Sequence, residues 1–188
     1  MPDRNIVVLT APSGAGKTTI AHRVLEAMPE MQFSVSATTR NARPDETDGE
    51  DYHFLSTEEF EHRIEKGDLL EYEEVYPGQF YGTLRSEIVT KAEDGPVLLD
   101  IDVEGALNVK RLFGDDALVL FIAPPSKDEL RNRLEGRGTE DERTLANRLE
   151  RAERELEKVD AFDAVVVNDD LDTAVEETLS RIRQFLDT

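Results

Sequence analysis

The nine residues Ala11-Pro12-Ser13-Gly14-Ala15-Gly16-Lys17-Thr18-Thr19 decide the fold of this chain. They follow an apolar run at residues 6–9 and open a segment at residues 18–27 that has helical character. A glycine-rich turn between a strand and a helix, ending in Gly-Lys-Thr, is the pattern of a phosphate-binding loop. Its glycines let successive amides point at an anion, and the helix N-terminus adds its dipole. The stretch therefore predicts a phosphate site at the end of a strand.

Lys17 and Thr18 carry the side-chain chemistry of this loop. In the P-loop pattern the lysine reaches the β- and γ-phosphates, and the hydroxyl holds Mg²⁺. The pattern also asks for glycine six positions before the lysine, where this sequence has Ala11. Alanine costs little there if its φ stays negative. We therefore predict a P-loop protein that binds a nucleoside triphosphate and Mg²⁺ through residues 11–19.

Further apolar runs predict the rest of a parallel sheet. They lie at residues 97–99, 118–122 and 164–167, and they are continuous rather than alternating. Continuous runs indicate strands that are covered on both faces, as in a parallel sheet flanked by helices. Helical segments at 103–112 and 171–186 alternate with them. The pattern predicts an α/β, three-layer P-loop fold.

Two polar stretches interrupt this alternation. Residues 33–85 contain one clear helix, at 57–66, and predict an inserted subdomain. Residues 126–159 are charged and helical around Gly136-Arg137-Gly138-Thr139, which is what a mobile lid needs. We expect one domain of 188 residues, with a core of 1–32, 86–125 and 160–188.

The chain is strongly acidic, with 42 acidic against 22 basic residues and a formal net charge of −20. Such a surface repels nucleic acid polymers and anionic membranes, so neither is an expected partner. Adaptation to a high-salt cytoplasm is one explanation, and a highly soluble surface is the other. The chain has no cysteine, no apolar run of membrane-spanning length and no signal-peptide pattern, and a cytoplasmic location is expected.

The loop alone does not separate kinases from GTPases and ATPases. Residues 102–105 fit the D-x-x-G pattern of GTPases, but no Asn-Lys-x-Asp motif accompanies them. A kinase must bring two phosphate anions together, which requires neutralising charge. Arg40 and Arg43 in the insertion and Arg133, Arg137 and Arg148 near the lid are candidates. Arg40 stands before Pro44, where helical ion pairing is not expected, and this favours a phosphate-binding role.

Several short motifs follow the phosphate loop along the chain. They are Phe33-Ser34-Val35-Ser36-Ala37-Thr38-Thr39-Arg40, Arg43-Pro44, Gly49-Glu50-Asp51-Tyr52, Glu71, Phe80-Tyr81-Gly82-Thr83, Leu99-Asp100-Ile101-Asp102 with Gly105, Phe121-Ile122-Ala123-Pro124-Pro125-Ser126, Arg133-Leu134, Gly136-Arg137-Gly138-Thr139 and Val167-Asn168-Asp169-Asp170-Leu171. With these motifs in this order, the chain resembles the guanylate kinases along nearly its whole length.

The resemblance implies which residues bind GMP. Those matching the family's phosphate contacts are Ser36, Arg40, Arg43, Tyr52 and Tyr81, and those matching its guanine contacts are Glu71, Thr83 and Asp102. The chemistry agrees, because guanine presents N1–H and N2–H₂ to a carboxylate such as Glu71, whereas adenine presents an acceptor at N1. Thr83 is expected to donate to the guanine O6.

The resemblance and the chemistry also assign the ATP side. Asp100 ends a strand beside the loop, where a P-loop protein places the acid that orients Mg²⁺ or its waters. Asp100 and Asp102 are expected on the same side of that strand. Lys17, Arg40, Arg137 and Arg148 are the predicted catalytic residues, and Arg133, Arg137 and Asn168 join the loop in binding ATP. The remaining arginines of the lid stretch, Arg131, Arg143, Arg151 and Arg154, are interpreted as surface ion-pair partners.

We therefore expect an ATP-dependent, Mg²⁺-dependent kinase of GMP, and of dGMP as well. Two alternatives remain: a related kinase of another phosphorylated acceptor such as a ribose bisphosphate, and a non-catalytic binding module. The oligomeric state is left open between a monomer and a homodimer.

Overall fold

The computed structural model describes residues 6–135 and 142–187. Its central sheet has five parallel strands in the order β2-β7-β1-β8-β9. These strands are β1 (Ile6–Thr10), β2 (Gln32–Phe33), β7 (Val97–Asp100), β8 (Ala117–Ala123) and β9 (Ala164–Val167). The first strand lies in the middle, so the loop that follows it opens at the centre of the sheet's carboxyl edge, where open α/β sheets bind ligands.

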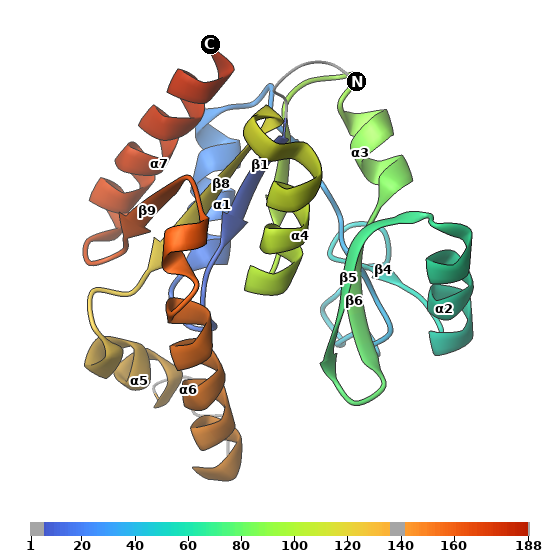
Figure 1. The fold of residues 1–188 in the computed structure, drawn as a ribbon, viewed down its shortest axis with the longest axis horizontal. Coiled ribbons are helices and arrows are strands. Elements are labelled where there is room, and N and C mark those ends of the chain that lie inside the picture. Colours follow the sequence, from blue (N-terminus) through green and yellow to red (C-terminus); the bar gives the residue numbers. More distant parts are fainter. Residues whose placement is uncertain (1–5, 136–141, 188) are drawn as a thin grey trace.

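Helices cover both faces of this sheet (Figure 1). They are α1 (Lys17–Ala27), α3 (Arg85–Lys91), α4 (Val103–Phe113) and α7 (Leu171–Leu186), with short 3₁₀ turns at Gly114–Asp116 and Val159–Ala161. Helices α1 and α7 pack on one face, and α3 and α4 pack on the other. The layered arrangement confirms the predicted α/β class with a parallel sheet between helices.

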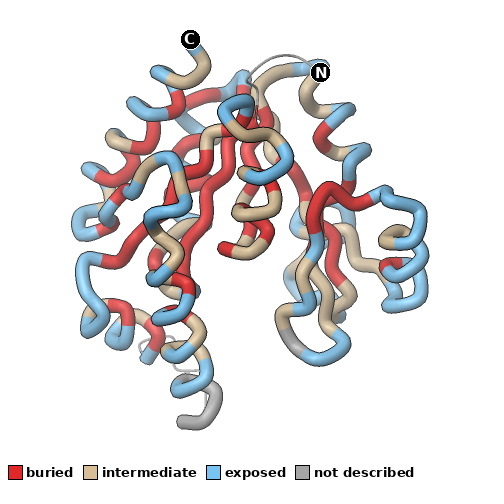
Figure 2. The backbone as a smooth tube through the Cα atoms, in the orientation of Figure 1, coloured by how far each residue is buried: buried red, intermediate tan, exposed pale blue. Residues whose placement is uncertain are grey.

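The alternation of side chains along β1 explains why its sequence reads as continuously apolar. Val7 and Leu9 belong to the core under α1 and α7, whereas Ile6 and Val8 belong to the core under α4. All of them are buried, and Figure 2 shows the central strands as the most continuously buried part of the chain. A strand covered on both faces needs apolar residues at every position.

A second sheet lies to the side of the core (Figure 1). Its order is β4-β3-β6-β5. The elements of this part are β3 (Ala37–Thr38), β4 (His53–Phe54), α2 (Thr57–Lys66), β5 (Leu69–Tyr76) and β6 (Gln79–Leu84). The predicted helix at 57–66 is confirmed, capped by the Ser56 side chain and ended by Gly67 at φ 72°. The strands around it were not predicted.

Two charged helices, α5 (Lys127–Glu135) and α6 (Glu142–Leu156), fill the predicted lid stretch. They pack on each other through Leu130, Leu134 and Ala152, and they extend away from the sheet opposite the second sheet (Figure 1). The predicted hinge at 136–139, with Arg137, lies outside the described residues. No helix in the described ranges is long and apolar enough to cross a membrane.

Candidate active site

The phosphate loop joins β1 to α1 through two glycines in left-handed conformations. Gly14 has φ 92° and Gly16 has φ 94°, values that residues with a Cβ rarely adopt. Gly16 is also the N-cap of α1, so Lys17 is the first helical residue. Ala11, which replaces the glycine of the usual pattern, is buried in the core beneath the loop. The loop therefore presents a helix N-terminus toward the space above the sheet.

Asn168 supports the phosphate loop through a hydrogen bond to the loop backbone. Its amide nitrogen donates to the backbone oxygen of Ala15 at 2.7 Å, and a Cβ on Gly16 would come within 2.3 Å of that nitrogen. Arg133 in turn donates to the backbone oxygen of Asn168 at 3.0 Å. Both residues were predicted as ATP contacts. The geometry gives them a loop-supporting position, and direct contact with ATP stays a prediction.

Lys17, Thr18 and Asp100 meet at the carboxyl edge of the sheet. The Thr18 hydroxyl donates to Asp100 Oδ2 at 3.0 Å, and the Lys17 ammonium forms an ion pair with the same carboxylate. Burial lowers the pKa of Lys17 to about 8, while the carboxylates of Asp102 and Glu155 oppose that shift. The predicted metal pair, Thr18 and Asp100, is thus in direct contact.

A cavity of about 490 Å³ opens between this edge and the second sheet. Its lining includes the predicted residues Lys17, Thr18, Ser36, Tyr52, Glu71, Tyr81, Asp100 and Asp102. The volume is in the range of small-molecule sites. The fold therefore brings residues that are far apart in the sequence into one chamber.

Glu71 is the most buried acid of this chamber, only 6% exposed. It pairs with Thr83 in the β5–β6 register, and the Thr83 hydroxyl donates to Glu71 Oε1 at 2.6 Å. Burial raises the pKa of Glu71 to about 7, the Thr83 hydrogen bond opposes the rise, and the Asp102 charge adds to it. Thr83 was predicted to donate to a guanine O6. Its hydroxyl donates to Glu71 in this structure, and the contact with guanine O6 stays a prediction.

Asp102 lies near Glu71, but it does not alternate with Asp100 on one strand as expected. Strand β7 ends at Asp100, so the two acids do not alternate on one strand. Asp102 is the N-cap of α4, and its Oδ1 accepts from the Gly105 amide at 2.8 Å. The expected alternation of the two acids on one strand was therefore wrong, but Asp100 and Asp102 do line the same cavity.

Arg40 forms an ion pair with Glu46 that was not predicted. Its Nη1 and Nη2 donate to the two carboxylate oxygens of Glu46 at 2.7 and 2.8 Å, and its guanidinium lies 5.0 Å from the Tyr52 ring centroid. These bonds lower the pKa of Glu46 to about 2. Arg40 lies outside the helices, as expected, but a loop supplies an acid for an ion pair that was not predicted. A bidentate carboxylate uses the same fork that a phosphate would use.

Arg43 is more open than Arg40. Its side chain is 71% exposed, and its Nη1 lies 3.9 Å from Glu46. Its backbone amide donates to Glu46 at 2.7 Å, so Glu46 ties the two predicted phosphate-binding arginines together.

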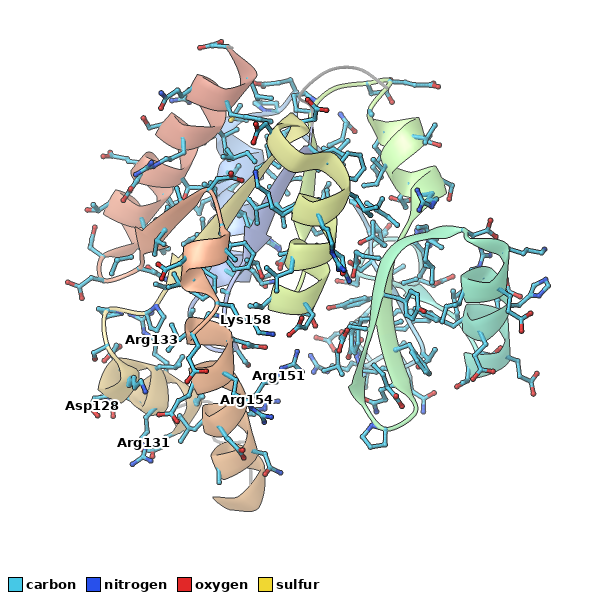
Figure 3. The ribbon with its side chains drawn as sticks, in the orientation of Figure 1. Asp128, Arg131, Arg133, Arg151, Arg154 and Lys158 are labelled. Carbon is cyan, nitrogen blue, oxygen red and sulfur yellow. The ribbon has the colours of Figure 1, made fainter. Side chains whose placement is uncertain are left out.

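Helix α6, in the stretch predicted to be a lid, faces the phosphate loop across a second cavity of about 320 Å³. Arg148, Arg151 and Glu155 line it together with the loop. Arg151 was interpreted as a surface ion-pair partner. It does form ion pairs, at 3.1 Å with Asp102 and at 2.7 Å with Glu155, yet it lines both cavities. Figure 3 shows Arg151 reaching from α6 toward the second sheet, whereas Arg131 lies on the outer side of α5.

Comparison with known proteins agrees with this geometry. A family model described as guanylate kinase matches residues 3–185. The chain belongs to the guanylate kinase family. A guanylate kinase of Salinibacter ruber is 81% identical over 186 residues, covering 99% of both chains, and one of Chlorobium luteolum is 52% identical, covering 97% of this chain and 93% of the relative.

A solved guanylate kinase has the same fold. The crystal structure of the enzyme from Anaplasma phagocytophilum matches 97% of this chain and 86% of its own, with a TM-score of 0.78 and 33% identity. Membership of the guanylate kinase family confirms the predicted family, the P-loop fold and the class of nucleoside monophosphate kinase. It supports neither the ribose bisphosphate kinase nor the non-catalytic module.

Two residues of the site, Glu155 and Glu46, were not predicted from the sequence. Glu155 is 8% exposed and lines the second cavity, and burial raises its pKa. Glu46 was not singled out either. Spacing offered a signal for the lid, because residues 148, 151 and 155 repeat at helical intervals and share one face. No comparable signal marked Glu46, which lies in an irregular loop.

Proposed function

We propose that this chain transfers the γ-phosphoryl group of ATP to the phosphate oxygen of GMP, giving ADP and GDP. One observation carries the proposal: a single cavity is lined by Lys17 and Asp100 of the phosphate-loop side and by Glu71 and Tyr81 of the second sheet. A phosphoryl donor and an acceptor must meet in line, and a chamber shared by both recognition sets allows that.

The donor half would hold the ATP phosphates. Amides of the loop and the N-terminus of α1 face the anion, and Lys17 supplies a positive charge that burial leaves poorly solvated. Hard oxygen donors suit Mg²⁺, and the Thr18 hydroxyl and the Asp100 carboxylate lie together where it would bind. Bound Mg²⁺ would neutralise charge on the phosphates.

Water and the ATP phosphates would complete the coordination of that ion. Among the described residues, no group of three or more His, Cys, Asp or Glu side chains is arranged to hold a metal by itself. A site with one or two protein ligands is the usual way in which nucleotide enzymes bind Mg²⁺.

The acceptor half would read the base and bind its phosphate. An ionised Glu71 accepts from guanine N1–H and N2–H₂, with Asp102 beside it, and a buried carboxylate left unpaired by adenine penalises AMP. Ser36, Tyr52 and Tyr81 line the cavity, and Arg40 contacts the Tyr52 ring. These groups and Arg43 would hold the phosphate dianion, with the Arg40 fork moving from the Glu46 carboxylate toward the ligand.

Transfer would need no general base, because the attacking phosphate oxygen is already ionised at neutral pH. The rate would come from positioning and from charge neutralisation by Lys17, Arg40, Arg137 and Arg148. Residues 33–85 and 126–159 would act as the two parts that close over the nucleotides, which would exclude water and suppress hydrolysis of ATP.

A coupled assay of ADP formation tests this function. ATP is offered with GMP, dGMP, AMP, UMP and a ribose bisphosphate in separate reactions. We expect turnover with GMP and dGMP, and at least about a hundredfold lower kcat/KM with AMP, because the carboxylate of Glu71 would face an acceptor. Equal turnover of AMP, or turnover of the ribose bisphosphate alone, would contradict the proposal.

A further inference from the structure

Gly105 leaves room for the carboxylate of Glu71. It is the third residue of α4, which starts at Val103. A Cβ built on Gly105 would lie 2.5 Å from Glu71 Oε2, 3.1 Å from Glu71 Cδ and 3.3 Å from Asp102 Oδ1. A carbon and an oxygen that are not bonded do not approach to 2.5 Å, so no residue with a side chain can occupy position 105 while Glu71 stays where it is.

The backbone gives no other reason for a glycine here. Gly105 is not among the glycines with positive φ, and it lies inside a regular helix. Glycine is the poorest helix former apart from proline, and alanine is the best. Glycine at position 105 therefore lowers the helix propensity of α4, and it leaves space for the Glu71 carboxylate.

We propose that Gly105 is a positioning residue for base recognition. The missing Cβ lets the Glu71 carboxylate sit against the first turn of α4, between the Thr83 hydroxyl at 2.6 Å and the Asp102 carboxylate. The inference rests on the proposed function, in which Glu71 reads the guanine edge. It also explains the D-x-x-G pattern of residues 102–105: the Asp102 side chain caps the helix at the Gly105 amide, and Gly105 admits Glu71.

An alanine at position 105 would displace the carboxylate rather than the helix. The atoms within 3.1 Å are at the end of the Glu71 side chain, which can rotate. Val103 and Ala106 anchor the helix backbone, since both are fully buried. The displaced carboxylate would lose the Thr83 hydrogen bond and its alignment with guanine N1–H and N2–H₂.

The experiment is Gly105→Ala in the full chain, measured against GMP and IMP, which lacks the N2 amino group. We expect kcat/KM for GMP to fall about 10- to 100-fold, the loss of hydrogen bonds to a charged group. The preference for GMP over IMP should fall toward 1, and KM for ATP should stay unchanged. The melting temperature should change little, because the helix propensity gained with alanine offsets the loss of the Thr83 hydrogen bond.

Two further variants separate positioning from a general disturbance. Asn108→Ala improves the helix propensity of α4 away from Glu71 and should leave the preference for GMP intact. Glu71→Asp shortens the side chain by one methylene, so adding Gly105→Ala to it should cost less than the same change costs beside Glu71.

An unchanged GMP/IMP preference in Gly105→Ala would overturn the inference. So would a lowered melting temperature with an equal loss of GMP and ATP, since that indicates a damaged fold. If Glu71→Gln abolishes the preference while Gly105→Ala keeps it, only this inference fails. If Glu71→Gln itself keeps the preference, the base-reading role of Glu71 in the proposed function fails as well.

Discussion

The phosphate loop and the acceptor pocket open into one cavity, yet the chain builds them in opposite ways. The loop is nine consecutive residues held by neighbours that are already buried, such as Asn168 behind Ala15. The acceptor pocket takes Glu71 from one strand, Thr83 from the next and Asp102 from the start of a helix in the core. A site made of consecutive residues can be predicted from the sequence. A site assembled from two strands and a helix depends on how those elements pair and pack.

The charged groups of the two halves also differ in what they face. Lys17 already lies against Asp100 in the core, at the place where phosphates and Mg²⁺ would bind. Arg40 instead holds Glu46, a carboxylate from its own loop. Under the proposed function, binding on the donor side would need little rearrangement of the loop, and binding on the acceptor side would replace the Glu46 carboxylate at Arg40 by the phosphate of GMP.

The largest effect is expected from Lys17→Met. The methionine keeps a similar volume but removes the charge at the transferred phosphate, so kcat should fall by about a thousandfold or more while the melting temperature is retained. Steady-state assays and thermal unfolding measure both. Lys66→Met, an exposed position on α2, is the matched control and should be active. Near-normal turnover of Lys17→Met would break the assignment of the donor half.

The pH dependence separates the two halves next. The pKa of Glu71 is raised to about 7, so its carboxylate is protonated below that pH and cannot accept from guanine. We expect kcat/KM for GMP to fall about tenfold per pH unit below 7. The Glu71→Gln variant controls for the GMP phosphate, which titrates near pH 6 in both proteins. An identical pH profile in that variant would show that Glu71 is not the group being titrated.

A smaller effect on the donor side is expected from Asn168→Ala. The change leaves the buried Ala15 carbonyl without its 2.7 Å hydrogen bond, which should cost about 1–3 kcal/mol of unfolding free energy. KM for ATP should rise several-fold while KM for GMP does not change. Urea unfolding and steady-state kinetics test this. Equal losses for both substrates would mean that the loop is not supported separately from the acceptor pocket.

The sequence revealed the core and the donor loop because each follows from local pattern. Strand β9 and helix α7 begin and end where the apolar pattern predicts. The expected burial on both faces was wrong for β9, which is an edge strand in which Val166 is buried and Val165 and Val167 are exposed. In β5 the same reasoning fails. Glu71, Glu73 and Glu74 are close together on one strand, and only the pairing with Thr83 and the space at Gly105 select Glu71 for burial.

The arginines were the least predictable part for the same reason. Arg40 finds Glu46 through an irregular loop, where no periodicity relates the two positions. Arg151 has helical spacing to Glu155, which was visible, but its contact with Asp102 spans 49 residues of sequence. Contacts of that kind are set by how α6 packs on the rest of the fold.

The smallest effect is expected from salt, and it should act on neither half in particular. With a net charge of −20, acidic groups repel one another over the whole surface, and raising KCl from 0.1 to 1 M shortens the screening length from about 10 Å to about 3 Å. The melting temperature should rise by about 2–4 °C for each kcal/mol of repulsion removed, the conversion for a chain of this size. A protein equally stable at both concentrations would end the hypothesis of adaptation to high salt.

The most direct test of the two-part site is a calorimetric titration of Glu71→Gln with GMP and, separately, with ATP and Mg²⁺. The account predicts that GMP binding weakens by about tenfold or more and no longer exceeds IMP binding, while ATP binding is the same as in the unsubstituted protein. The opposite result, GMP bound as tightly and as selectively as before, would contradict the claim that the buried carboxylate of Glu71 reads the base.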